Sequence, residues 1–200
     1  MLEKIRLFIN WFEVANPIRG KEYLFVLQKN IGNAYIDEIH VFCEKGKVPP
    51  VLTEKCVFYS VESRRTYADF LRLMSTFDGI RIIANLDIFF DDTIALTYKM
   101  PHDECFALSR WEDTERLFDR KDSQDVWIFN GLIKKIDADF ELGRIGCDNR
   151  FAYELQKAGY VVRNPSRSIK AYHVHNTLRD GATRTKRIQE PYRYVSPEVL

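Results

Sequence analysis

The sequence predicts an α/β fold built on a mixed, mainly parallel central sheet flanked by helices. Short apolar segments typical of buried strands alternate with segments whose apolar residues recur at helical spacing. Turn-forming stretches, among them Asn16-Pro17 and Gly46–Pro50, separate these segments. Strands that alternate with helices along a chain are typical of parallel sheets with crossover helices. We therefore expect a sheet that is parallel at least in the first half of the chain.

The first half of the chain contains the clearest elements. Strands are predicted at Ile5–Trp11, Asp37–Glu44, Val57–Ser60 and Arg81–Ala84. One helix is predicted at Tyr23–Lys29, after the Asn16-Pro17 break, and it ends near Gly32. A second helix is predicted at Thr66–Thr76, because its apolar residues have helical spacing and Thr66 suits the N-cap position.

The second half is less regular. Strands are predicted at Cys105–Trp111 and Val126–Asn130, and Tyr160–Arg163 is predicted as the last strand. The segment LGRIGCDNR leads from a Gly-punctuated loop into a helix from Asp148 to Ala158, with Gly159 just past its end. From about Asn176 the chain is polar and basic. Residues 1–200 are thus interpreted as a single domain with a basic C-terminal extension.

The composition excludes several classes of protein. The chain has 200 residues, 46% of them hydrophobic and 30% charged, as in a globular domain with a real core. A formal net charge of +1 gives no field that would attract nucleic acid, so no nucleic-acid partner is expected. The four cysteines are widely spaced, which favours reduced thiols. Because neither a signal peptide nor a transmembrane segment is evident, we expect a soluble cytoplasmic protein.

A carboxylate, Asp87, stands between two apolar runs, Arg81–Ala84 and Ile88–Phe90. An unpaired charge in such surroundings is costly. Either the strand ends there and Asp87 bonds a neighbouring loop, or something positive sits against it. In open α/β sheets, ligands bind beyond the carboxyl ends of the strands. Those ends carry Asn10-Trp11, Cys43-Glu44, Ser60 and Asn85-Leu86-Asp87.

Two of the polar motifs suit a metal ion. Asp87 in Asn85-x-Asp87 can offer an oxygen to a hard divalent cation that bridges phosphates, although an Asp at a strand end is common. His173 and His175 are two residues apart, so in an extended segment both rings face one side. They could reach one metal, or form a hydrogen-bonded pair near the surface. Mixed oxygen and nitrogen ligands suit Mn²⁺.

Three further motifs carry polar groups. Asp148 follows a glycine turn, where it could cap a helix or act on an acceptor hydroxyl. Gln124 and Asp125 precede the strand with Trp127, in a plain turn or at a sugar-recognition site. Arg65 and Asp69 share a helix face, either as a surface ion pair or to read a nucleotide. The sequence has no GxGxxG, Walker, HExxH or GxSxG motif, which argues against the enzyme classes that they mark.

With these motifs in this order, the sequence resembles glycosyltransferases of the GT-A fold. The resemblance rests on ANLDIFFDDTI, SQDVWIFNG, LGRIGCDNRFAYELQKAGY and NPSRSIKAYHVHNTLR. It extends over roughly Ile5 to Arg179. The most similar members are the compact glycosyltransferase domains of large chlorella viruses, which are thought to glycosylate the major capsid protein. Similar domains occur in bacterial surface-polysaccharide loci.

The resemblance implies a role for each matched residue. The DxD motif of the family falls on Asn85-Leu86-Asp87, where Asn85 replaces the first acid and Asp87 is the expected metal ligand. The metal-binding histidine falls on His173 or His175, and the acceptor-side acid falls on Asp148, with Asp125 as a second catalytic candidate. The loop along the uracil falls on Asn10 and Trp11. Nucleotide-sugar contacts are further assigned to Arg65, Asp69, Gln124 and Arg179.

These roles imply a metal-dependent glycosyltransferase. It would use Mn²⁺ or Mg²⁺ and a UDP-sugar donor, with a glycan or glycoprotein as acceptor, such as a viral capsid protein in the host cytoplasm. Retention of the anomeric configuration is favoured over inversion, by analogy only. Because Asn85 replaces an acid, the alternative is a catalytically lapsed nucleotide- or sugar-binding module. A nucleotidyltransferase is disfavoured, because no Gly-rich phosphate loop follows the first strand.

Overall fold

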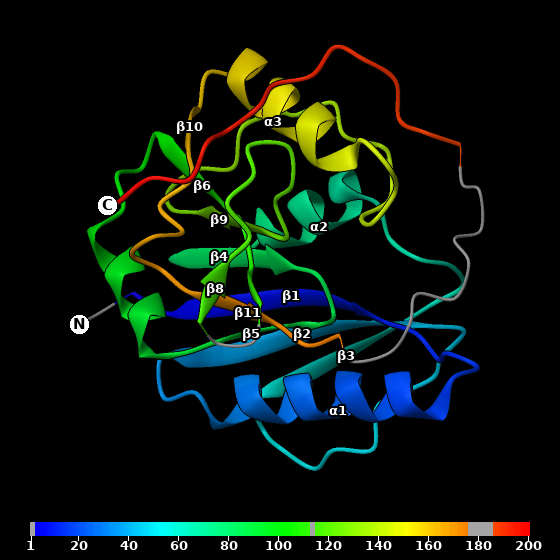
Figure 1. The fold of residues 1–200 in the computed structure, drawn as a ribbon. Coiled ribbons are helices and arrows are strands. Elements are labelled where there is room, and N and C mark those ends of the chain that lie inside the picture. The colour runs from blue at the N-terminus through cyan, green and yellow to red at the C-terminus, as the bar shows by residue number, and fades with distance from the viewer. Residues whose placement is uncertain (1–2, 113–114, 176–185) are drawn as a thin grey trace.

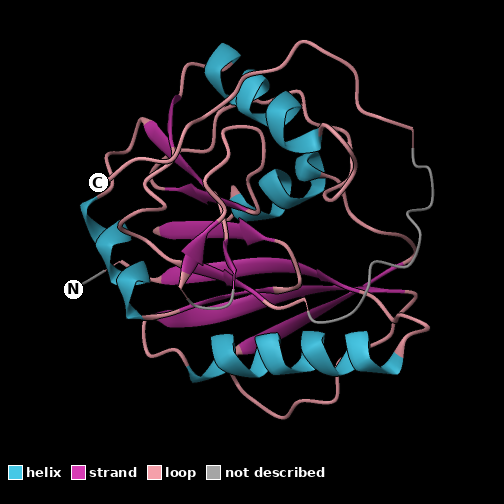
Figure 2. Ribbon diagram, in the orientation of Figure 1, coloured by secondary structure: helices cyan, strands magenta, loops and turns pink. Residues whose placement is uncertain are grey.

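The computed structural model describes residues 3–112, 115–175 and 186–200. A central sheet separates one long helix, α1, from the two helices α2 and α3 on its other face (Figure 1). Figure 2 shows the same layers by type of element, with helices on both sides of the strands. The predicted α/β class, with a mixed and mainly parallel sheet between helices, is confirmed.

Seven strands form the central sheet, in the order β10-β6-β9-β4-β1-β2-β3. Strands β1 to β4 are mutually parallel, as predicted for the first half of the chain. Strand β9 runs antiparallel to both of its neighbours, β4 and β6. The strand bounds are β1 Ile5–Trp11, β2 Ile36–Glu44, β3 Cys56–Val61, β4 Ile80–Ala84, β6 Glu104–Leu108, β9 Val126–Phe129 and β10 Val161–Arg163.

A smaller sheet of four short strands lies beside the first, in the order β5-β11-β7-β8. Its strands are β5 Ile88–Phe90, β7 Trp111–Glu112, β8 Arg116–Leu117 and β11 Ala171–His173. The prediction that Tyr160–Arg163 is the last strand is therefore wrong, because β11 follows it. Strands of two or three residues are too short for alternation of polar and apolar residues to reveal them. The pairing of β5 with β11 brings the segment after Asp87 next to His173.

Helix α1, Pro17–Gly32, starts a turn and a half before the predicted Tyr23. Asn16-Pro17 is the start of the helix and not a break before it. The Asn16 side chain accepts hydrogen bonds from the backbone N–H groups of Ile18 and Arg19. Proline is well suited to the first helical position, because its missing N–H has no partner there anyway.

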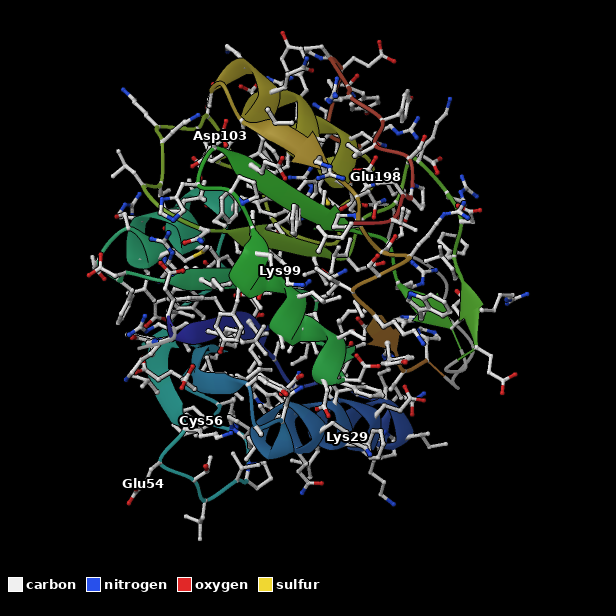
Figure 3. The ribbon with its side chains drawn as sticks, turned by 90° about the vertical axis from the view of Figure 1, so that its left-hand side faces the viewer. Lys29, Glu54, Cys56, Lys99, Asp103 and Glu198 are labelled. Atoms are coloured by element: carbon white, nitrogen blue, oxygen red, sulfur yellow. The ribbon has the colours of Figure 1, made fainter. Side chains whose placement is uncertain are left out.

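The other helices are α2 Tyr67–Met74, η1 Asp92–Lys99 and α3 Cys147–Lys157, and η1 was not predicted. Thr66 caps α2 as predicted, in a capping box with Asp69. Figure 3 shows the side of the molecule that carries the amino ends of the parallel strands. Cys56, the first residue of β3, and Lys99, the last residue of η1, both lie on this side. The carboxyl ends lie at the opposite edge.

Two apolar cores fill the space between the layers. One contains Leu27 of α1 and Ile82 of β4, and the other contains Phe151 of α3 and Trp127 of β9, all at most 1% exposed. Residues 186–200 contribute to the second core through the buried Val195. The four cysteines are free thiols. No helix in the described parts of the chain is long and apolar enough to cross a membrane.

Candidate functional site

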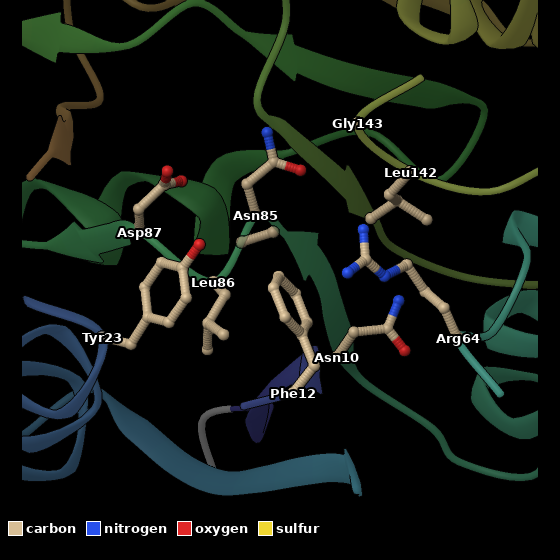
Figure 4. Close-up of a pocket in the computed structure, with 10 residues that line it drawn as sticks. Asn10, Phe12, Tyr23, Arg64, Asn85, Leu86, Asp87, Leu142 and Gly143 are labelled. Carbon is tan, nitrogen blue, oxygen red and sulfur yellow. The ribbon is translucent and has the colours of Figure 1, made fainter. Parts of the chain in front are cut away.

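A pocket of about 150 Å³ opens at the carboxyl ends of β1 and β4 (Figure 4). This is the edge at which the sequence predicts a ligand site. Asn10 at the end of β1 and Asn85 just after β4 both line it, as expected. The full lining is Asn10, Phe12, Tyr23, Arg64, Ala84, Asn85, Leu86, Asp87, Leu142 and Gly143.

Asp87, His173 and His175 meet at one side of this pocket. One ligand atom from each lies within 4.8 Å of the others. The backbone brings them together, because β5 pairs with β11 and the Val174 N–H donates to the Asp87 carbonyl at 3.0 Å. The two imidazole rings lie side by side, 5.5 Å apart and 20° from parallel. The prediction that both histidines face the same side is confirmed.

Of the two alternatives that the sequence leaves open for Asp87, the structure shows the second: a positive side chain lies against this carboxylate. The Arg19 guanidinium, from the first turn of α1, pairs with Asp87 Oδ2. Nε2 of His173 lies 3.3 Å from the same oxygen. Burial by itself would raise the pKa of Asp87, but His173 and Arg19 outweigh it and hold that pKa below its ordinary value. The carboxylate is therefore ionised and ready to act as a ligand.

The donor set fits a divalent cation of the Mn²⁺ type. Asp87 offers a hard oxygen, and the two histidines offer nitrogens that Mn²⁺, Fe²⁺ or Zn²⁺ accept. Three protein ligands at the mouth of a pocket leave further positions for water or for ligand oxygens. All three side chains are only partly buried, and Asp87 lines the pocket.

Asn85 continues the site towards Asp125. Its side-chain amide donates to Asp125 Oδ1 at 2.8 Å, and its backbone N–H donates to the Asp125 carbonyl at 3.0 Å. The other carboxylate oxygen of Asp125 accepts from Arg110 at 3.2 Å. Burial raises the pKa of Asp125 in spite of Arg110. Asp125 thus holds Asn85 in place at the pocket wall.

Asp148 is the carboxylate whose charge interacts with that of Asp125. Helix α3 begins at Cys147 with Gly146 at the N-cap, so the reading of Asp148 as a cap is wrong and it occupies the first turn. Its carboxyl accepts from the Cys147 thiol at 3.1 Å and from the backbone of Gln124. Burial, followed by the nearby charge of Asp125, raises the pKa of Asp148 to about 7.

Asn10 and Arg64 lie on the side of the pocket away from Asp87, and the Phe12 ring lies between them and Leu86 (Figure 4). The Arg64 guanidinium lies 3.8 Å from the centre of the Phe12 ring. The Asn10 amide pairs with the backbone of Arg65 through two hydrogen bonds of 3.3 Å each. Trp11, predicted to lie along a nucleotide, is 7% exposed and packs in the core on the α1 side. Alternation along β1 puts Asn10 and Phe12 on the pocket side instead.

Among the described residues, the other predicted nucleotide-sugar contacts, Arg65, Asp69 and Gln124, do not line the pocket. Arg65 and Asp69 form the expected ion pair at 3.8 Å, and Asp69 also completes the cap of α2. Gln124 is 1% exposed and donates to the Val195 carbonyl, so it fastens the C-terminal segment. Arg179 lies outside the described residues.

Besides Phe12 and Arg64 in the pocket lining, three charged or polar residues around the site were not predicted: Arg19, Tyr23 and Arg110. The sequence signal for Arg19 and Tyr23 is the Asn16-Pro17 pair, which starts α1 early enough to place both beside Asp87. The Arg19 guanidinium stacks 4.6 Å from the centre of the Tyr23 ring. No local signal marks Arg110, because its partner Asp125 lies on the far side of a long loop.

Sequence comparison finds no matching protein-family model and no matching curated protein. Among solved structures, the chain is similar to the mannosyltransferase PcManGT from Pyrobaculum calidifontis, solved in complex with GDP-Man and Mn²⁺. The TM-score is 0.53 at 13% sequence identity, and the match covers 90% of this chain. This chain spans 59% of the length of that one. The likeness shows that this chain shares a Rossmann-like α/β fold with that mannosyltransferase.

Proposed function

We propose that the protein is a metal-dependent glycosyltransferase that transfers a sugar from a UDP-sugar to a glycan or glycoprotein. The observation that carries the proposal is that Asp87, which lines the pocket, meets His173 and His175 with ligand atoms within 4.8 Å of one another. It occurs at the carboxyl edge of a sheet whose fold is shared with a glycosyltransferase. Neither the fold nor the three ligands would suffice alone.

The leaving group of the proposed reaction is a nucleoside diphosphate, on which negative charge builds as the glycosidic bond breaks. Asp87, His173 and His175 would hold a divalent cation, which supplies Lewis-acid stabilisation of that charge. Arg19 and Arg64 bring further positive charge, one to each side of the pocket. Asn85 brings no charge, but its position at the pocket wall suits a bond to a ribose hydroxyl.

The acceptor side of the proposal rests on Asp148 and Asp125. Because burial and Asp125 raise the pKa of Asp148 to about 7, this carboxyl can take a proton from an acceptor hydroxyl near neutral pH. Asp125 positions Asn85 through its hydrogen bond of 2.8 Å. A general base of this kind contributes roughly 10²–10⁴ in rate.

The finer parts of the proposal come from the sequence resemblance. They are the uridine base, retention of the anomeric configuration, and an acceptor such as a capsid-protein glycan in the host cytoplasm. The structural neighbour was solved with GDP-Man, so guanosine donors belong in the same test. Anomeric configuration is read directly from the product by NMR coupling constants.

A screen of UDP- and GDP-sugars tests the proposal, with release of free nucleoside diphosphate as the readout. Turnover is expected with Mn²⁺ and should vanish with chelator. Asp87→Ala, His173→Ala and His175→Ala should each abolish it while the far-UV circular dichroism stays native. The control is Arg6→Gln, which breaks an ion pair of similar burial at the other end of β1. Intact turnover in all three alanine variants would contradict the proposal.

One observation favours a second candidate, a lapsed nucleotide- or sugar-binding module. Asn85 stands where the GT-A resemblance expects an acid, and its amide is engaged with Asp125. Such a module would bind UDP equally well with Mn²⁺ and with chelator, and would never release sugar from the donor. The same screen separates the two candidates.

A further inference from the structure

Arg19 is held by three different groups around the proposed metal site. One guanidinium nitrogen donates to Glu22 and to the Val174 carbonyl, both at 2.7 Å. The other nitrogen pairs with Asp87 Oδ2. The Arg19 side chain is 11% exposed, and its guanidinium stacks on Tyr23. A charged group therefore sits against the same carboxylate that would bind the cation.

Asp87 cannot serve both cations equally well. A guanidinium and a divalent ion about 4 Å apart repel each other by roughly 4 kcal/mol for each positive charge on the ion, at the effective dielectric of a protein surface. Metal binding to Asp87 therefore requires the Arg19–Asp87 pair to loosen. A nucleoside diphosphate changes this balance, because its phosphate oxygens offer the guanidinium another bidentate partner.

We propose that Arg19 is an exchange residue: it pairs with Asp87 as the structure shows and moves to the diphosphate when metal and nucleotide bind together. This inference rests on the proposed function, since it assumes a metal–nucleotide site at Asp87. Its consequence is coupling between the two ligands. Metal or nucleotide binding alone carries the full free-energy cost of breaking the Arg19–Asp87 pair. When both bind, that cost arises only once, so each ligand strengthens the binding of the other.

Arg19 is positioned for such a move. It belongs to the first turn of α1, where the Asn16 cap and Pro17 fix the backbone and leave the long side chain to reorient. Tyr23, which its guanidinium stacks on, lines the pocket next to Asp87 (Figure 4). Arg19 can therefore leave Asp87 for a ligand in the pocket while its guanidinium stays against the Tyr23 ring.

The test measures binding and does not depend on turnover. Mn²⁺ affinity is followed by the EPR signal of free Mn²⁺, with and without UDP, in wild type, Arg19→Gln, Arg19→Lys and Arg6→Gln. Arg6 is a matched control, because its side chain is 13% exposed, pairs with a carboxylate and lies over an aromatic ring.

In wild type, UDP is expected to tighten Mn²⁺ binding strongly. In Arg19→Gln, Mn²⁺ alone should bind about tenfold more tightly, equivalent to about 1.4 kcal/mol, because the competing charge is gone. The enhancement by UDP should fall at least about tenfold. Arg19→Lys keeps the positive charge but loses the paired N–H donors of the guanidinium. The affinity for Mn²⁺ alone should therefore stay as low as in wild type, while the increase in that affinity caused by UDP should fall. Arg6→Gln should match wild type.

The outcomes separate the two claims. If wild type binds no Mn²⁺ with or without UDP, the proposed function fails. If wild type shows the coupling and both Arg19 variants keep it unchanged, only the exchange role of Arg19 is overturned. Should Arg19→Gln fail to fold, Arg19→Lys decides the matter by its coupling alone.

Discussion

Two clusters of similar composition lie at opposite ends of the parallel strands. At the amino ends, Arg6 pairs with Glu38 at 2.8 Å, and His40 Nε2 lies 3.4 Å from the same carboxylate. At the carboxyl ends, Arg19 pairs with Asp87, and His173 Nε2 lies 3.3 Å from it. Each cluster contains an arginine, a carboxylate and a histidine.

The surroundings of the histidine distinguish them. His40 is 1% exposed, stacks 4.5 Å from the Phe8 ring, and its other nitrogen bonds the Tyr59 hydroxyl. Burial lowers the pKa of His40. His173 instead has His175 beside it, and its carboxylate partner lines a pocket. The cluster at Asp87 is a candidate metal site because a second histidine lies beside the ion pair and its carboxylate lines a pocket.

Asp148 differs from both Glu38 and Asp87 in the direction of its pKa shift. Glu38 is partly buried, but Lys4 and Arg6 outweigh that burial and lower its pKa to about 2. Asp148, at the end of the sheet that carries the pocket, has its pKa raised to about 7 by burial and by Asp125. The lowered pKa values keep Glu38 and Asp87 ionised, whereas the raised pKa of Asp148 lets this group exchange protons near neutral pH.

The largest expected effect comes from Asp148. In wild type the rate should rise about tenfold per pH unit up to about pH 7, because only the carboxylate form accepts a proton. Asp148→Asn should lose roughly 10²–10⁴ in rate and that pH dependence. Steady-state rates between pH 5 and 9 check this. An unchanged profile in the variant would remove Asp148 from the mechanism.

The second prediction contrasts His175 with His40. His175→Ala should weaken Mn²⁺ binding by about 10–100-fold or more, because a ligand is lost. Its melting temperature should change little, since this side chain is partly exposed. His40→Ala should leave Mn²⁺ binding unchanged and destabilise the fold by about 1–3 kcal/mol. Titration with Mn²⁺ and thermal unfolding of both variants provide the comparison, which fails if the two histidines behave alike.

The smallest effect concerns Glu38. Because its folded-state pKa is lowered from 4.5 to about 2, its ion pairs stabilise the fold fully above pH 4.5 and lose this effect as the pH falls towards 2. Glu38→Gln should cost about 1 kcal/mol or less at pH 7 and nothing near pH 2. Denaturant unfolding at several pH values measures it. A loss that grows as the pH falls would contradict the assignment.

Much of the fold follows from local sequence patterns. The strands Ile5–Trp11 and Ile80–Ala84 are continuous apolar runs, and Thr66 with Asp69 is a local capping signal. The two-residue strands β7 and β8 escape such patterns, because two residues are too few to show an alternation of polar and apolar side chains. They pair with each other, and β7 also pairs with the distant strand β11, which the sequence near β7 does not reveal.

Some residues of the candidate site can likewise be predicted from local sequence patterns, and others cannot. Asp87 is conspicuous in the sequence because a carboxylate between apolar runs needs a partner, and the His173-x-His175 spacing is visible by eye. Arg19 was missed because Asn16-Pro17 was interpreted as a break and not as the start of a helix. Trp11 was assigned to the pocket without regard to alternation along β1, which turns it into the core.

The central claim is that Asp87 helps to hold a cation and a nucleoside diphosphate together. Calorimetry of UDP binding, with Mn²⁺ and then with chelator, tests it most directly on wild type and Asp87→Ala. We predict that Mn²⁺ tightens UDP binding in wild type and has no effect in Asp87→Ala. Equal UDP affinity with Mn²⁺ and with chelator in wild type, or no UDP binding under either condition, would contradict the account.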